Sequence, residues 1–363
     1  MNINYSKLSH YSINDYFNKD KTNCTKYLLI SSYGLLTLIQ AKTSHSIIKK
    51  YISKVHSILG SFDNTDLASK LKWVQSLNGV DKTLLDESVK GLKNIRCGLA
   101  KQGVDHEIYI NYITKWVYSL IVASKYLKNP KYLYLACQLM LTLYEHNLNT
   151  INTILPIQTL EFSHESLDVF ITLASLIINL KHLLPLQSPT IKLYIKLLTS
   201  MLENNIPRII DYINNPKRLN TLEPIPLGIG FLLVSCLKIR LIINYKIMDN
   251  SILYKLYELL LKQSRSSLNK IRFNVHGINN NAYRWYGLCI GLEAINTLNH
   301  YYINKIFNDK YNSNIKILLK YYGLKHSIIK NFKTYSYNKG NCHEYQDINC
   351  VMFLNTKYPI LSI

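Results

Sequence analysis

Acidic residues are scarce in this sequence. It has 22 aspartates and glutamates against 43 lysines and arginines, which gives a formal net charge of +21 over 363 residues. An excess of this size suggests nucleic acid or an anionic surface as a partner. The cations are mostly lysines, however, and they are scattered along the whole chain without a dense basic stripe. This pattern favours a surface solvated by lysine, so we expect no nucleic-acid partner.

Closely spaced cysteine pairs and glycine-rich loops are also missing. The seven cysteines are an odd number, and no two of them have the spacing Cys-x-x-Cys. Several lie within apolar helical runs, which is typical of buried free thiols in a reducing compartment. Gly228 and Gly230 are too isolated for a phosphate-binding loop, and close helix packing explains them better, so we expect no cofactor. The cysteines are Cys24, Cys97, Cys137, Cys236, Cys289, Cys342 and Cys350.

No uninterrupted apolar run is long enough for a membrane span. The longest apolar stretch runs from Pro226 to Tyr245, but Lys238 and Arg240 interrupt it. The first ten residues are polar and lack the apolar core of a signal peptide. These observations predict a soluble cytoplasmic protein with no membrane partner.

Alternating strand patterns are absent, and helical periodicity takes their place. Tyr112, Trp116 and Leu120 recur every four residues, and Asn129 can cap a following helix. The stretch Glu107–His146 therefore predicts two long helices joined by a short turn. The rest of the chain repeats this unit without a βαβ rhythm, which makes the fold class all-α.

About a dozen helices are expected, mostly in consecutive pairs. Residues 1–26 form a polar N-terminal segment, and residues 27–363 are expected to form one domain. The expected helices are Tyr27–Ala41, Ser46–Leu59, Leu67–Leu77, Leu84–Leu92, Glu107–Leu127, Lys131–His146, Ser166–His182, Ile191–Glu203, Pro226–Asn244, Ile252–Gln263, Asn279–Tyr301, Ile315–Tyr322 and His343–Phe353.

Alternate helices are apolar nearly all round, as in Leu133–Tyr144 and Leu227–Leu237. Such helices have protein on every side, as an inner ring enclosed by an outer ring requires. The sequence similarity between the pairs is weak, which argues against tight open repeats. We therefore predict an (α/α) toroid of about six helical hairpins.

Tyr109–Trp116 and His164–Asp168 are two of several blocks that follow one another in order along the chain. They resemble the blocks Tyr-Phe-His-Tyr-Leu-Thr-Lys-Trp and His-Asp-Pro-Leu-Asp of a family of six-hairpin-glycosidase-like (α/α) toroid proteins. The other similar segments are Val55–Gly60, Arg96–Lys101, Pro226–Leu233, Tyr283–Leu292 and Glu344–Met352. The resemblance implies a site in a central funnel and a carbohydrate ligand, but it implies no established reaction.

The chain departs from the family's pattern at three acidic positions. The acidic block before the tyrosine segment is shortened to Gln102–Glu107, with its charges out of register. Ile225 stands where the family has an aspartate, and Trp285 stands where it has a glutamate. Two functions therefore stay open, a glycosidase-like enzyme and a non-catalytic helical binding or scaffold protein that has lost the acids.

Candidate site residues follow from the chemistry of glycoside hydrolysis, which usually uses two carboxyls across the sugar. The acidic clusters lie at or before helix N-termini, where acids also complement the helix dipole without any catalytic role. Aromatic side chains could stack on sugars but are more often core residues. The catalytic candidates are Asp105, Glu107, Glu165, Asp168, Glu344 and Asp347. The substrate-binding candidates are Tyr112, Lys115, Trp116, His164, Arg284, Trp285 and Asn349.

A third interpretation is a zinc enzyme that resembles the lanthionine cyclases. Those proteins share the double ring of helices and hold zinc with one cysteine and a later Cys-His pair. Cys289 and the pair Cys342-His343 have a compatible separation. The segment Glu344–Met352 fits the glycosidase-like family better, and His276-Gly277 lies too close to Cys289 for the cyclase order. We therefore expect no metal site.

Overall fold

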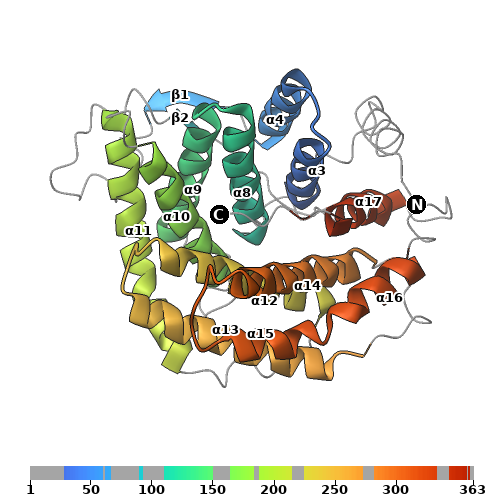
Figure 1. Cartoon of the computed structure of the whole chain (residues 1–363). Coiled ribbons are helices and arrows are strands. Elements are labelled where there is room, and N and C mark those ends of the chain that lie inside the picture. The colour runs from blue at the N-terminus through green and yellow to red at the C-terminus, as the bar shows by residue number, and fades with distance from the viewer. Residues whose placement is uncertain are drawn as a thin grey trace. The chain divides into compact units, whose positions relative to one another are not determined.

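The computed structural model describes residues 28–59, 62–66, 90–92, 110–149, 164–183, 188–214, 225–272, 282–332, 343–357 and 359. The chain divides into two compact units, Met1–Arg208 and Ile209–Ile363. The expected single domain over residues 27–363 stays a prediction. Figure 1 labels the elements of both units.

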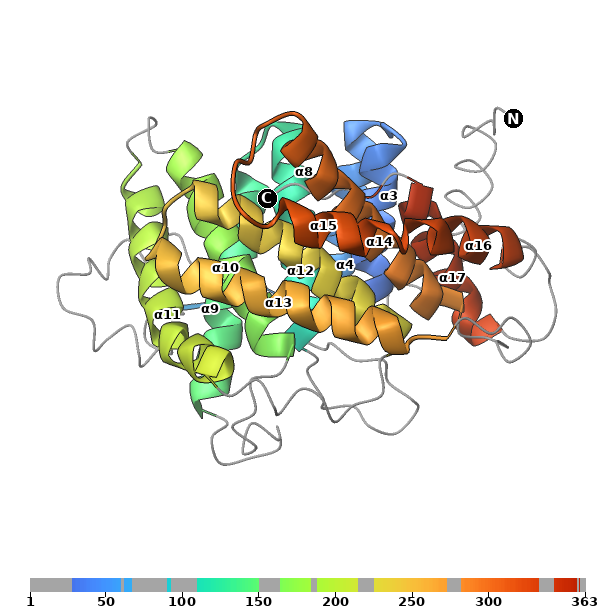
Figure 2. The ribbon, with the colours of Figure 1, turned by 60° about the horizontal axis from the view of Figure 1, so that its bottom comes forward.

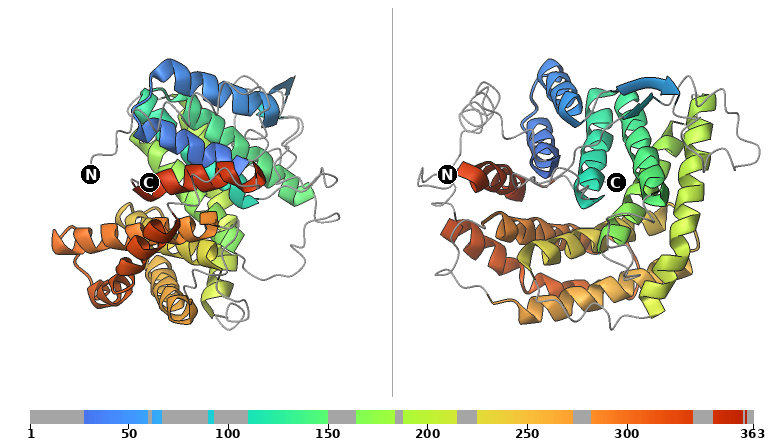
Figure 3. Two further views of the ribbon diagram at one scale, coloured as in Figure 1. Left: turned by 90° about the vertical axis from the view of Figure 1, so that its right-hand side faces the viewer. Right: turned by 180° about the vertical axis from the view of Figure 1, so that it is seen from behind.

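The first unit contains α3 (Leu28–Gln40), α4 (His45–Leu59), α8 (Ile110–Leu127), α9 (Lys131–Asn149), α10 (His164–His182) and most of α11 (Pro189–Asn214). Helix α8 packs against α3, α9 and α10, so it lies at the centre of this unit. Figure 3 shows α8 and α9 between the α3–α4 pair and α10. Asn129 Oδ1 accepts a hydrogen bond from the backbone N–H of Lys131 over 3.0 Å, which confirms the predicted cap of α9.

The first unit also contains two short strands, β1 (Phe62–Asp66) and β2 (Lys90–Leu92), which pair antiparallel with an irregularity in the register. No strand is predicted from the sequence in this region. The helix predicted over Leu84–Leu92 is wrong for its last three residues, because they hydrogen-bond to β1 instead of continuing a helix. The expected helix Leu67–Leu77 lies outside the described residues. Helices make up nearly all of the described structure, so the all-α class is confirmed.

The second unit contains α12 (Pro226–Asn244), α13 (Asn250–Lys270), α14 (Ala282–Ile303), α15 (Asn312–Leu319), α16 (Tyr322–Phe332) and α17 (His343–Lys357). Helix α14 packs against α12, α15, α16 and α17, and α12 also packs against α13. Figure 2 shows α12 behind α13 and α15. Both α12 and α14 are buried on nearly all sides, as the apolar sequence of α12 predicts.

Glycines allow α12 and α14 to approach each other closely. A Cβ atom added to Gly230 would lie 2.1 Å from the carbonyl oxygen of Gly287, and one added to Gly291 would lie 2.6 Å from the Cα of Gly230. The helix backbones are therefore in direct contact, which confirms close packing as the role of Gly230. It does not explain Gly228, because a Cβ there would meet nothing within 4 Å.

Helix α12 is the one helix among the described residues that is long and apolar enough to cross a membrane. In the structure it is a core helix, with 67% of its apolar window buried within the protein. Lys238 and Arg240, which interrupt its apolar sequence, are both buried. Arg240 is paired with Asp309, so its charge is compensated inside the protein.

Candidate functional site

Lys115 and Asp168 form the core of the candidate site. Lys115 comes from the tyrosine-rich block of α8 and Asp168 from the first turns of α10, 53 residues later. Lys115 Nζ donates to both carboxylate oxygens of Asp168, over 3.1 and 3.0 Å. The Lys115 side chain is 17% exposed and that of Asp168 is 11% exposed. Water screens such a pair little, so each charge depends on the other for compensation.

Helix α3 supplies the surroundings of this ion pair. Burial raises the pKa of Tyr33 on α3, and the negative charge of Asp168 raises it further. Tyr33 is therefore a neutral phenol near the carboxylate. Ser119, one turn after Lys115, donates to the carbonyl of Ser32 on α3 over 3.0 Å. Helices α3, α8 and α10 thus meet around Lys115 and Asp168.

Trp116 and His56 form a second buried contact beside this cluster. The indole nitrogen of Trp116 on α8 donates to Nε2 of His56 on α4 over 3.2 Å. An indole N–H can only donate, so His56 Nε2 carries no proton and the ring is neutral. Burial lowers the pKa of His56 to about 4, which agrees with a neutral ring. Trp116 is fully buried and offers no exposed face to a sugar.

In the second unit, α17 and α14 bring together another group of predicted residues. Asn349 Oδ1 on α17 accepts a hydrogen bond from the backbone N–H of Tyr283 over 2.6 Å. This N–H lies in the first turn of α14, where no carbonyl within the helix can accept it. Asn349 therefore acts as a cap supplied by a neighbouring helix. Arg284 Nε donates to the hydroxyl of Tyr283 over 3.2 Å, and Trp285 is buried.

The described carboxylates that are not exposed to solvent are all in ion pairs with lysine or arginine. They are Asp168 with Lys115, Glu258 with Lys262 and Lys310, Glu293 with Lys325, and Asp309 with Arg240. Apart from the bond between Glu258 and Lys262 within α13, these pairs join different elements of one unit. The scarce acids thus hold helices together by compensating cations at the helix contacts.

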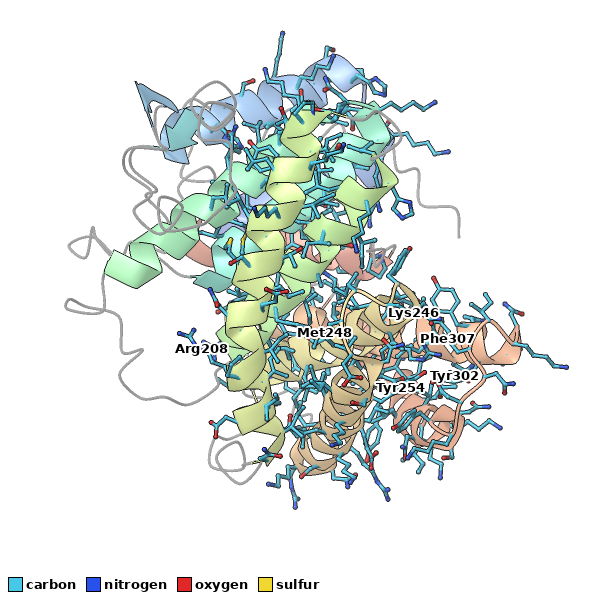
Figure 4. All side chains as sticks on the ribbon, turned by 90° about the vertical axis from the view of Figure 1, so that its left-hand side faces the viewer. Arg208, Lys246, Met248, Tyr254, Tyr302 and Phe307 are labelled. Atoms are coloured by element: carbon cyan, nitrogen blue, oxygen red, sulfur yellow. The ribbon has the colours of Figure 1, made fainter. Side chains whose placement is uncertain are left out.

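The pair of Arg240 and Asp309 is the most extensive of these contacts. Arg240 Nε donates to Asp309 over 2.8 Å, and its Nη1 donates to Asn244 over 2.8 Å. Its guanidinium carbon lies 3.8 Å from the ring centroid of Phe307. The hydroxyl of Tyr302 donates to the other oxygen of Asp309 over 2.7 Å. Figure 4 shows Tyr302 and Phe307 side by side at this end of α14.

The remaining site candidates have side chains that lie outside the described residues. Asp105 and Glu107 lie wholly outside them. The others belong to described helices by their backbone only, namely Tyr112 on α8, His164 and Glu165 on α10, and Glu344 and Asp347 on α17. Their roles therefore stay predictions.

Cys289 is the zinc candidate whose side chain is described. It is a buried free thiol on α14, and its Sγ lies 3.9 Å from the carbonyl oxygen of Lys325. Cys342 and the side chain of His343 lie outside the described residues. Within the described part of the chain, no three His, Cys, Asp or Glu side chains lie close enough to hold a metal ion. Cys137 and Cys236 are buried free thiols as well, and burial raises the pKa of Cys236 to about 12.

Sequence reasoning missed several residues of these networks. His56 and Tyr33 were not site candidates, although both are buried, Tyr33 on the apolar helix α3 and His56 on the inner face of the amphipathic helix α4. The sequence could have predicted that Arg240 forms a buried ion pair, because a cation inside an apolar helix requires a partner. Nothing in the sequence identified Asp309 as that partner, 69 residues away.

Comparisons with known proteins identify no relative of this chain. No protein-family model matches the chain, and no significant match to it was found among curated proteins or solved structures.

Proposed function

We propose that the chain is a non-catalytic helical binding or scaffold protein of the (α/α) toroid type. The observation that supports this proposal is the pairing of every described carboxylate that is not exposed with a lysine or arginine. A glycosidase needs one carboxyl held protonated and a second one as nucleophile or base. Lys115 donates to both carboxylate oxygens of Asp168, so neither oxygen is free to act as a nucleophile.

The toroid architecture is supported by the order of the helix contacts within each unit. Successive helices pack as neighbours, as α3 does on α4, α8 on α9, and α12 on α13. Three residues separate α8 from α9, which is short enough for a helical hairpin. The helices α12 and α14 are buried nearly all round, as inner helices of a double ring would be.

Glycosidase-like catalysis is the second candidate function. It is favoured by the position of Asp168 one turn after Glu165 on α10, since side chains three residues apart lie on one face of a helix. In that case Glu165 would act on the substrate and Asp168 with Lys115 would position it. A carbohydrate is the ligand class that the resemblance of these blocks implies.

A combined binding and hydrolysis screen separates the two functions. Purified protein is tested against a panel of oligosaccharides for binding and for release of reducing sugar, beside Glu165→Gln and Asp168→Asn. The proposal predicts no release by any of the three proteins and a lowered melting temperature for Asp168→Asn. Release by the parent chain that is lost in Glu165→Gln, with its melting temperature unchanged, would contradict the proposal and establish the second candidate.

A further inference from the structure

We infer that α13 and α15 of the second unit form a binding surface for the phosphate backbone of a nucleic acid. The surface, called here the basic face, consists of Lys262, Arg265, Lys310, Lys316 and Lys320, which are all exposed. It does not depend on the cluster of Lys115 and Asp168, which belongs to the first unit. The sequence alone shows these cations only as scattered residues, and the fold brings them together.

Two contacts place α15 beside α13 in a parallel direction. Tyr311, just before α15, donates to Glu258 on α13 over 3.3 Å. Tyr321, just after α15, donates to Asn269 near the end of α13. Figure 2 shows the two helices side by side. Glu258 and Asn269 therefore mark the two ends of the line along which α13 faces α15.

The cations of the basic face lie between these two ends. Lys262 and Arg265 have the spacing that puts them on the same line of α13 as Glu258 and Asn269. Lys316 and Lys320 are one helical turn apart on α15 and its C-cap, about 6 Å along the axis. Lys310 lies near the other end, where its ammonium is 3.8 Å from Glu258. The two helices and their flanking residues thus carry five exposed cations along their shared length.

Acidic residues are few in the part of the chain that carries most of this surface. From residue 259 to residue 343 the chain has two acids, Glu293 and Asp309. Both are engaged within the unit, Glu293 with Lys325 and Asp309 with Arg240. They therefore neutralise cations of the interior. Glu258, the one acid of α13, pairs with Lys262 and Lys310 and offsets part of the charge of the basic face at one end.

Nucleic acid fits this surface better than an anionic membrane does. Stable binding at a bilayer surface usually combines exposed apolar side chains with cations. The described large apolar residues that are exposed in the second unit are Ile210, Ile225, Tyr245, Ile303 and Ile306, and none of them belongs to α13 or α15. A phosphate backbone needs only cations and hydrogen-bond donors, and the basic face consists of these.

The test measures the salt dependence of binding by fluorescence anisotropy. The probes are a labelled single-stranded RNA and a labelled duplex DNA, with vesicles of anionic phospholipid as a third arm. The variant Arg265→Gln/Lys316→Gln/Lys320→Gln is compared with Lys49→Gln/Lys50→Gln/Lys192→Gln, which removes three exposed lysines of the first unit. Circular dichroism and the melting temperature confirm that both variants are folded.

The inference predicts binding of at least one nucleic-acid probe by the parent chain. The variant of the basic face should bind at least about tenfold more weakly, with the slope of log K against log salt reduced by about 3. The control should change affinity by less than about threefold. Equal losses of affinity in the two variants would show that binding depends on the charge of the whole chain and not on the basic face. This result would overturn the inference. Absence of nucleic-acid binding, or binding to the vesicles alone, would overturn it as well.

Discussion

Lys115 holds Asp168 by both carboxylate oxygens, over 3.1 and 3.0 Å, across the contact between α8 and α10. The two residues come from two of the sequence blocks that resemble the six-hairpin-glycosidase-like family, Tyr109–Trp116 and His164–Asp168. Their meeting in the structure places these blocks at one position of the first unit. The same contact engages both oxygens of one of the candidate catalytic acids, so it supports a structural role for Asp168 more than a catalytic one.

The buried His56 predicts that stability falls in acid. Its pKa is about 4 in the folded chain and about 6.5 when unfolded, so between these values the unfolded chain binds more protons. The stability that the neutral His56 contributes is fully present above about pH 6.5. The free energy of unfolding then falls by about 3 kcal/mol at most as the pH decreases toward 4. The measurement is the free energy of unfolding by urea at several pH values, on the parent chain and on His56→Phe. The pH dependence of the variant should be shallower by this amount, and parallel curves would contradict the prediction.

The contact between α12 and α14 predicts opposite effects for two similar substitutions. Gly230→Ala should destabilise the protein by about 3 kcal/mol, because its Cβ would lie 2.1 Å from the carbonyl oxygen of Gly287 and the helices must move apart. Gly228→Ala on the same helix should stabilise by about 0.5 kcal/mol, since its Cβ meets nothing within 4 Å. Denaturant unfolding of both variants gives the two values. Similar stabilities for the two variants would show that the glycines do not set the helix separation.

Arg240 predicts that lysine cannot replace arginine inside α12. Lysine cannot bond Asp309 and Asn244 together or stack on Phe307 as the planar guanidinium does. We expect Arg240→Lys to lower the unfolding free energy by about 2 kcal/mol. Lys262→Met is the control, because the exposed Lys262 pairs with the half-buried Glu258 over 3.1 Å and water screens this ion pair, so the melting temperature should stay unchanged within error. Equal effects of the two substitutions would refute a special role of the buried arginine.

Helix positions could be predicted from the sequence wherever apolar periodicity and caps agree. The helices α4, α8 and α12 begin within a few residues of their predicted starts. The predicted end of α11 at Glu203 is too early, because the helix continues through Pro207 to Asn214. Glu203 and Pro207 are both exposed, so water can bond the carbonyl that the missing N–H of proline leaves free. The helix predicted over Ile315–Tyr322 ends where α16 begins, and α16 itself was not predicted because its apolar pattern is weak.

The pairing of side chains could not be predicted in the same way. Lys115 and Asp168 were both candidates, but a separation of 53 residues gives no sequence signal for a contact. Asn349 was predicted to bind substrate, whereas in the structure it caps α14 through the N–H of Tyr283. Periodicity identifies which face of a helix is buried, but the partner of a buried polar group depends on which helices become neighbours.

The double-mutant cycle of Lys115→Met and Asp168→Asn tests the structural role of the buried acids most directly. Each single substitution removes one charge of this pair from the compensation of the other and should cost about 2 kcal/mol, while the double variant should lose less than the sum. The account predicts a coupling energy of about 1–2 kcal/mol from urea unfolding. A coupling energy near zero, with the stability of Asp168→Asn equal to that of the parent chain, would contradict it.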